Sequence, residues 1–317
     1  MYLSPSGRPL GYALLIDDDA ESLRAGGRTP WGTWIACESD RGDGRILEID
    51  PFGSGEAKET ILGMEDRPND FDDDVWEDWV DDWWDQDEDH WGGGECAGFA
   101  YDDREKDKIY FYLTQDEDDG PIRRYTPSKY SAKSKDDRSF RLLHEPGGKW
   151  EYLVWIPDAA DPDDGGGASD PNDPSAPLTP ASTGEILWTE NVELGRISAD
   201  QYFRDCRGIA RHGSELYFVT EDARRLMVVD LDEWEFRSYS TDAMGMTGVP
   251  DQVTVMLAGP EMMDGGEGGW GKNKYRDEEG IPLIFLTDRR PDGDGGGGGG
   301  GITVFNPPDG THREAMR

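Results

Sequence analysis

Acidic side chains stand where several predicted β-strands end, and they are the residues of this sequence best suited to chemistry. Each lies at the point where a β-rich run meets a polar turn: Glu38, Asp40, Asp116, Glu221, Asp222 and Asp288. Carboxylate oxygens are the ligands that Ca²⁺ prefers, and the ion takes about six to eight of them. If these strand ends meet in space, they form a calcium site. The alternative is that they are ordinary solvated turns.

Cys37 directly precedes Glu38 and would add one soft ligand to such a site. A thiolate among carboxylates suits iron rather than calcium alone. The alternative is that Cys37 is a small buried strand residue. The chain has two further cysteines, Cys96 and Cys206, at spacings that define neither a disulfide framework nor a zinc site, so at most one pair can bridge.

Other catalytic signatures are missing from the sequence. The glycine tract near the C-terminus matches the dinucleotide-binding pattern only trivially, because it lies between strands and opens no helix. There is no P-loop, zinc-protease or nucleophile-elbow motif. Asp85 opens a run like an EF-hand loop, but His90 replaces the required glycine and Cys96 the bidentate glutamate. The four histidines show no paired spacing, which argues against a His-based zinc site.

The charge of the chain excludes some partners. Of its 317 residues, 32 are Lys or Arg and 69 are Asp or Glu, which gives a formal charge of −37. A field of this sign repels phosphate backbones and anionic lipids, so neither nucleic acid nor a membrane is an expected partner. Divalent cations or a saline solvent would balance it. No apolar run approaches the length of a membrane span, and no export signal is expected at the N-terminus.

Four segments share one plan, and they would position the acidic residues. Each is a β-rich run that ends in an acidic turn and is followed by a second run, which predicts a hairpin. The segments are Thr33–Pro51, Lys108–Pro127, Glu215–Asp232 and Pro282–Pro307. Hairpins repeated in this way are typical of the blades of an all-β, β-propeller fold, with a β-sandwich as the alternative. We expect one propeller-like domain over residues 1–317.

Three insertions explain the irregular spacing of the hairpins. Residues 65–94 are acidic and carry tryptophans at helical spacing, which predicts an amphipathic helix that packs on the body of the protein or binds a protein partner. Residues 158–184 lack the apolar side chains that would order a loop, and we expect them to be disordered. Residues 293–301 form a glycine tract in a hairpin turn.

The run Ser22–Asp40 closely resembles the signature of PhoX-type alkaline phosphatases, in which a Gly-Gly-x-Thr-Pro-Trp-Gly-Thr stretch leads into a Cys-Glu-Glu motif. Here the run reads SLRAGGRTPWGTWIACESD. The stretch GECAGFAYDDREKDKIYFYLTQD is similar to a second segment of that family, and PDQVTV and GITVFNP are similar to two of its later strands. The resemblance spans nearly the whole chain.

The resemblance implies a propeller that holds calcium and iron and hydrolyses phosphate monoesters. It implies that Cys37 is the iron-binding thiolate, that Glu38 and Glu95 are metal-ligating carboxylates, and that Asp116 is the acid of the second motif. Asp222 joins this set as an acidic turn residue. Several cations would polarise the phosphoryl oxygens and neutralise the charge that develops on the leaving oxygen. The family also implies an exported protein.

The sequence departs from the family pattern at three places. Ser39 replaces the second glutamate after the cysteine. The family's Arg-x-Glu-Gly element, which holds phosphate and metal, is matched by the run Asp205 to Gly208, so Arg204 or Arg207 is the candidate for the phosphate and Asp205 for the metal. Only a short segment precedes Thr29, from which we expect an incomplete propeller. The two hypotheses are therefore a phosphatase that uses calcium and iron, and a calcium-binding or scaffolding propeller without turnover.

Overall fold

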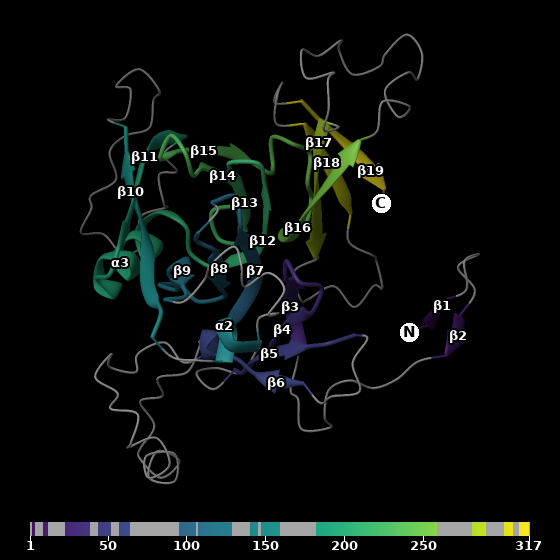
Figure 1. The fold of residues 1–317 in the computed structure, drawn as a ribbon. Helices are drawn as coiled ribbons and strands as arrows, with labels where there is room; N and C mark the ends of the chain where they lie inside the picture. The colour runs from purple at the N-terminus through teal and green to yellow at the C-terminus, as the bar shows by residue number, and fades with distance from the viewer. Residues whose placement is uncertain are drawn as a thin grey trace. The chain divides into compact units, whose positions relative to one another are not determined.

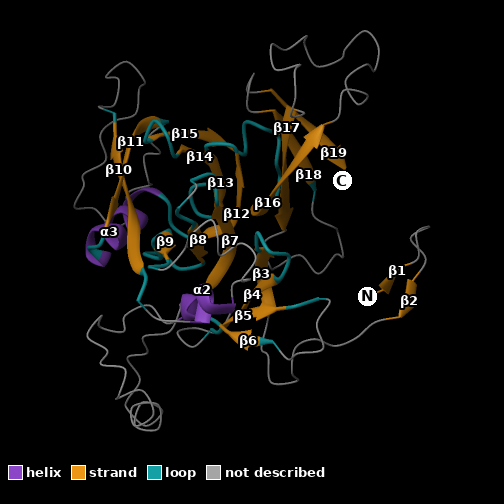
Figure 2. Cartoon of the chain, viewed as in Figure 1, coloured by secondary structure: helices purple, strands orange, loops and turns teal. Residues whose placement is uncertain are grey.

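The computed structural model describes thirteen segments of the chain. They are residues 2–3, 9–11, 23–38, 44–51, 57–63, 95–105, 107–128, 140–144, 147–158, 182–258, 281–289, 301–306 and 311–316. They divide into two compact units. Unit 1 comprises residues 1–96, 103–110 and 125–149, and unit 2 comprises residues 97–102, 111–124 and 150–317. Strands dominate the described residues, with few helices (Figures 1 and 2).

Unit 1 contains a four-stranded antiparallel sheet in chain order, with a 3-10 turn and a short helix beside it. Its elements are β3 (Leu23–Arg28), β4 (Trp34–Glu38), β5 (Ile46–Ile49), β6 (Lys58–Glu59), η1 (Ile61–Gly63) and α2 (Phe140–His144). A separate hairpin joins β1 (Tyr2–Leu3) and β2 (Pro9–Gly11). All four residues of β5 are buried, and β5 is one of the two inner strands of the sheet.

The largest sheet has nine strands in the order β12-β13-β14-β15-β11-β10-β9-β8-β7. The strands are β7 (Cys96–Asp102), β8 (Tyr110–Gln115), β9 (Arg123–Thr126), β10 (Lys149–Pro157), β11 (Thr183–Thr189), β12 (Cys206–His212), β13 (Glu215–Thr220), β14 (Arg225–Asp230) and β15 (Glu235–Ser240). It is two four-stranded meanders, β7–β10 and β12–β15, joined through β11. Burial alternates along β11, whereas β13 is buried on both faces.

A third meander consists of β16 (Val249–Ala258), β17 (Ile281–Arg289), β18 (Ile302–Asn306) and β19 (Thr311–Met316). One apolar cluster joins it to β13 and β14 of the preceding meander within unit 2. Its buried members are Tyr217, Val219, Leu226, Val228, Met244, Met246, Val253, Ile284, Leu286 and Phe305. Four-stranded antiparallel meanders that pack face to face in chain order are the blades of a propeller.

The all-β, propeller-type prediction is confirmed, and so are the four hairpins. They are β4–β5, β8–β9, β13–β14 and β17–β18. The pattern did not predict α3 (Val192–Tyr202), which begins at Asn191, whose side chain accepts hydrogen bonds from the backbone N–H groups of Glu193 and Leu194. Within the described residues, none of the helices has the length and apolar character to span a bilayer.

All three predicted insertions fall largely outside the described residues. The amphipathic helix over 65–94 lies outside them, and so does the glycine tract except for Gly301. Most of the loop predicted to be disordered over 158–184 also lies outside them, namely residues 159–181, and its last two residues belong to β11, which begins at Thr183. The Asp158 N–H, directly after β10, donates to the Thr183 carbonyl at 3.1 Å, so the two ends of this segment meet where the paired strands β10 and β11 meet.

Candidate functional site

Arg207 is a buried guanidinium shared by two carboxylates of unit 2. It is the second residue of β12 and is 7% exposed. Its Nη1 pairs with Asp116, the residue directly after β8. Its Nε and Nη2 donate to one oxygen of Glu221, directly after β13, at 2.9 and 2.5 Å. Arg207 therefore ties together the ends of two strands whose turns carry the acidic residues.

Arg289, the last residue of β17, binds the same carboxylate. Its Nη2 lies 2.5 Å from Glu221 Oε2, so a single oxygen accepts from two guanidinium groups. Burial raises the pKa of Glu221, but the hydrogen bonds and charges of Arg289 and Arg207 outweigh it, and the pKa is lowered overall. Glu221 is therefore an anion at neutral pH. The position between the two guanidinium groups favours a group that carries negative charge.

The backbone of Asp205 holds the two acidic turns together. Its N–H donates to the Glu117 carbonyl at 3.1 Å, and its own carbonyl accepts from the Glu221 N–H at 3.0 Å. Asp205 has a φ of 51°, the left-handed region that Asp and Asn tolerate better than most residues. An Asp at position 205 therefore suits the left-handed backbone, which brings the start of β12 between the turns after β8 and β13.

Three carboxylates from these segments gather in one place. Oxygens of Asp118, Asp205 and Asp222 all lie within 4.8 Å of one another. Two calcium ligands on opposite sides of the ion, each at about 2.4 Å, are about 4.8 Å apart, so the three oxygens fit one coordination shell. Burial, and then repulsion from Asp222, Asp116, Asp118 and Glu221, raise the pKa of Asp205 to about 7. A bound cation would relieve that repulsion.

Neighbouring candidates have other partners. Arg204 binds Asp200 one turn earlier in the chain, with 2.6 Å both to its carboxylate and to its backbone carbonyl. Cys206 is fully buried, and its Sγ donates to the Phe203 carbonyl at 2.9 Å. Burial first, and then the charges of Asp205 and Asp116, raise the pKa of this thiol well above its usual range. Cys206 is therefore a neutral thiol, unsuited to bind a metal.

The predicted ligands of unit 1 have different surroundings. Cys37 and Cys96 form a disulfide. The expectation of an iron-binding thiolate at Cys37 therefore differs from the structure, because a disulfide sulfur carries no negative charge. Glu38 is buried and accepts a fork of hydrogen bonds from Arg45, at 2.9 Å from Nε and 2.8 Å from Nη2. Glu95 directly precedes β7 and adjoins the disulfide.

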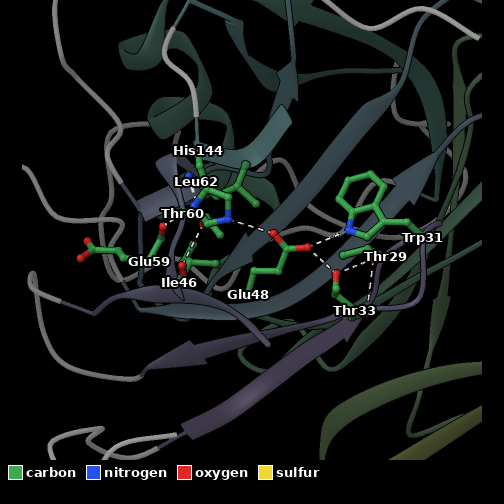
Figure 3. A network of polar contacts seen from close by, with 9 residues as sticks. All are labelled: Thr29, Trp31, Thr33, Ile46, Glu48, Glu59, Thr60, Leu62 and His144. Atoms are coloured by element: carbon green, nitrogen blue, oxygen red, sulfur yellow. Dashed lines mark hydrogen bonds and ion pairs between the residues drawn. The ribbon is translucent and has the colours of Figure 1, made fainter. Parts of the chain in front are cut away.

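Two residues of the Thr-Pro-Trp-Gly-Thr run, Trp31 and Thr33, bind a different carboxylate, Glu48 of β5 (Figure 3). The Glu48 side chain is fully buried. One of its oxygens accepts from Trp31 Nε1 at 2.7 Å and from the Thr33 hydroxyl, and the other lies 2.9 Å from His144 Nε2. The other nitrogen of His144 lies 2.7 Å from the Glu59 carbonyl. The most specific part of the sequence signature thus contributes to a polar network around a buried carboxylate. We call this network, formed by Trp31, Thr33, Glu48 and His144, the Glu48 network.

Sequence reasoning found some members of the unit 2 site and missed others. The structure brings together Asp116, Asp205, Asp222 and Arg207, whereas Cys37, Glu38 and Glu95 lie in unit 1. Asp40 lies outside the described residues, and Asp288 accepts backbone N–H groups of Gly248 and Gly301. Asp118, Arg289 and the Glu48 network were missed. The acidic run after β8 contained a signal for Asp118, but nothing local marks Arg289 or the Glu48–His144 contact.

Comparison with a solved structure supports the fold. No model of a known protein family matches the sequence, and no curated protein matches it significantly. A solved structure of PhoX from Pseudomonas fluorescens, in complex with vanadate as a transition state analogue, has a TM-score of 0.51 and 12% identity, and covers 93% of this chain. Virginiamycin B lyase from Staphylococcus aureus has a TM-score of 0.38 and 12% identity, with 99% of this chain and 76% of that chain covered. This chain spans 60% of the PhoX chain, and at such identity the likeness shows the fold alone.

Proposed function

We propose that this chain hydrolyses phosphate monoesters with the help of calcium bound at the start of β12. One observation carries the proposal: three carboxylates that could hold a cation and a buried guanidinium occupy the same strand ends. Asp118, Asp205 and Asp222 offer oxygens within 4.8 Å of one another, and Arg207 lies two residues after Asp205. Phosphoryl transfer needs positive groups around the phosphoryl oxygens, and here these would be the cation held by the carboxylates and the guanidinium.

The roles of the residues follow from their chemistry. The Arg207 guanidinium has the planar fork that binds two phosphoryl oxygens at once. A calcium ion held by Asp118, Asp205 and Asp222 would polarise a phosphoryl oxygen and neutralise charge on the leaving oxygen. Iron, which the sequence resemblance implies at Cys37, does not fit this structure, because Cys37 Sγ is bonded to Cys96. The proposal therefore needs no iron.

The proposal is supported by the PhoX-like fold and by the sequence resemblance of the Thr-Pro-Trp-Gly run. The solved PhoX structure holds vanadate as a transition state analogue, and this binding is an observation on that protein. A likeness of fold does not carry an activity with it, so the activity is tested directly.

The test is hydrolysis of p-nitrophenyl phosphate by the full chain, in 1 mM calcium and again in excess chelator, with metal content counted by mass spectrometry. We expect turnover that depends on calcium, and a loss of at least about 100-fold in kcat/KM in the R207Q variant. The matched control is R211Q, on the same strand, because Arg211 binds the Tyr101 carbonyl and lies 3.7 Å from Asp102. Equal activity in R207Q and R211Q would contradict the proposal.

A second function is favoured by the Cys37–Cys96 disulfide and by the carboxylates that already neutralise Arg207. In this alternative the chain binds calcium or a protein partner and has no turnover. It predicts stoichiometric calcium without iron and no hydrolysis of any phosphomonoester. A protein partner, including one for residues 65–94, belongs to this alternative.

A further inference from the structure

We infer that Glu221 is an internal stand-in for a tetrahedral oxyanion, and that it closes an anion site formed by Arg207 and Arg289. The inference rests on the proposed function for its substrate class, a phosphate monoester. It goes beyond that function in naming a second guanidinium, from another blade, and a residue that competes with the substrate.

The geometry at Glu221 is that of an occupied oxyanion position. Its Oε2 accepts from Arg207 Nε at 2.9 Å, from Arg207 Nη2 at 2.5 Å and from Arg289 Nη2 at 2.5 Å. Three charge-assisted donors on one oxygen are more than a carboxylate needs for a single ion pair. They come from β12 and β17, so two strands of unit 2 supply the donors.

Glu221 does not satisfy all the N–H donors of the two guanidinium groups. The Nε atom of Arg289 is buried and has no hydrogen-bond partner among the described residues. A buried donor without a partner is costly, which favours an acceptor with more oxygens than Glu221 presents. A phosphoryl group has three such oxygens in a tetrahedral arrangement, and it can accept from both guanidinium groups at once.

Displacement of Glu221 is feasible because the two guanidinium groups differ in how they are held. Arg207 keeps its second partner, Asp116, when Glu221 leaves. The side chain of Glu221 is 23% exposed and that of Arg289 is 40% exposed, whereas that of Arg207 is 9% exposed. The buried Arg207 is thus the fixed wall of the site, and Glu221 and Arg289 form the side that opens to solvent.

The experiment measures the binding of inorganic phosphate to the full chain by isothermal titration calorimetry, in wild type and in E221Q. Removal of the competing charge leaves Arg207 paired with Asp116, and we expect at least tenfold tighter binding in E221Q. The matched control is E151Q, which removes the carboxylate 2.6 Å from Arg124 in another, partly buried ion pair of unit 2. E151Q should bind phosphate as weakly as wild type does.

A double variant tests the role of Arg289. In E221Q/R289Q the tenfold gain should be lost, because one of the two guanidinium groups is gone. Equal phosphate binding in wild type and E221Q overturns the inference, and so does a gain that persists in the double variant. If E221Q does not fold, E221D replaces it: the charge stays, but the carboxylate is withdrawn by one methylene, so a smaller gain of about threefold is expected and no gain overturns the inference.

These outcomes are independent of turnover. If E221Q binds phosphate tightly and no variant hydrolyses a phosphomonoester, the anion site stands and the proposed hydrolysis fails. If wild type hydrolyses the ester and E221Q gains no affinity, the hydrolysis stands and the role of Glu221 fails.

Discussion

Asp205 combines an unusual backbone with an unusual titration, and both follow from its place between two acidic turns. Its φ of 51° lets its backbone bind Glu117 and Glu221, and the same position puts its carboxyl group among those of Asp116, Asp118 and Asp222. When no cation is bound, such a cluster of carboxyl groups holds a proton, because the proton reduces the repulsion among the negative charges.

Stability of the calcium-free chain should therefore fall as pH rises. The pKa of Asp205 is raised from about 4 in an unfolded chain to about 7 in the folded one, first by burial. Between these values the folded state holds a proton that the unfolded state lacks, so stability declines from about pH 4 to about pH 7 and is level above. The D205N variant should lose this decline, about 2 kcal/mol after solvent screening of a half-buried group is allowed for.

Urea denaturation in chelator at several pH values measures this difference. Asn suits the left-handed backbone as Asp does, so D205N isolates the charge from the conformation. An unchanged pH dependence in D205N would show that the proton is bound elsewhere.

The Glu48 network gives a second prediction about one residue. Three donors face the buried Glu48 carboxylate, from Trp31, Thr33 and His144. In E48Q an amide N–H₂ would point at one of these donors, which leaves two buried polar groups without partners. We expect the free energy of unfolding to fall by about 2–3 kcal/mol.

The matched control for E48Q is E59Q. His144 binds the backbone carbonyl of Glu59, which the substitution keeps, and residue 59 is exposed. E59Q should stay within about 0.5 kcal/mol of wild type in the same denaturation experiment. Equal effects of E48Q and E59Q would show that the network does not stabilise unit 1.

At the scale of the elements, close approach of strands sets the strongest constraint. A Cβ added at Gly208 of β12 would lie 2.7 Å from Gln252 Cα and 2.7 Å from Val253 N, both in the backbone of β16. Backbone cannot move aside as a flexible side chain can. We expect G208A to destabilise the chain by about 2–3 kcal/mol, because it forces β12 and β16 apart.

The control for G208A is G63A, where the added Cβ meets nothing closer than 3.4 Å. Thermal denaturation of both variants measures the difference, and G63A should stay close to wild type. G208A should also weaken phosphate binding, since its neighbour Arg207 moves with the strand. A stable G208A chain would contradict the close packing of these two blades.

The hairpins were predictable from the sequence because both strands of each hairpin and the turn between them lie within one short segment. In Glu215–Asp232, for example, two β-branched and aromatic runs flank a polar turn, and β13 and β14 form as expected. The contacts of the site are not local. Glu221 and Arg289 are 68 residues apart and Glu48 and His144 are 96 apart, so no spacing pattern relates them.

The same reason explains the outcome at the cysteines. Cys37 and Cys96 are 59 residues apart and lie in two different strands, β4 and β7, that do not form a hairpin with each other. The sequence allowed one pair to bridge but offered no way to choose it, and the motif around Cys37 favoured a thiolate. Only the arrangement of strands decides which sulfurs meet.

For the whole molecule, the net charge of −37 acts against the compact state as well as in favour of cation binding. Mutual repulsion among carboxylates is screened by any salt, with a Debye length of about 30 Å at 0.01 M and about 3 Å at 1 M. Coordination by Asp118, Asp205 and Asp222, in contrast, requires an ion that takes oxygen ligands at close range. The two effects can therefore be separated by the identity and concentration of the cation.

We expect the Tm of the chelated chain to rise by about 5 °C or more between 0.01 and 1 M NaCl, and equally in KCl, because screening depends on ionic strength alone. At constant ionic strength, about 1 mM calcium should add a further rise through mass action on the folded state. D222N should keep the salt response and lose the calcium response, since Asp222 is one of the three gathered carboxylates. Coordination of calcium at the start of β12 needs Asp222, whereas screening by calcium does not. A calcium response of the same size in D222N would therefore place the bound cation elsewhere on the acidic surface.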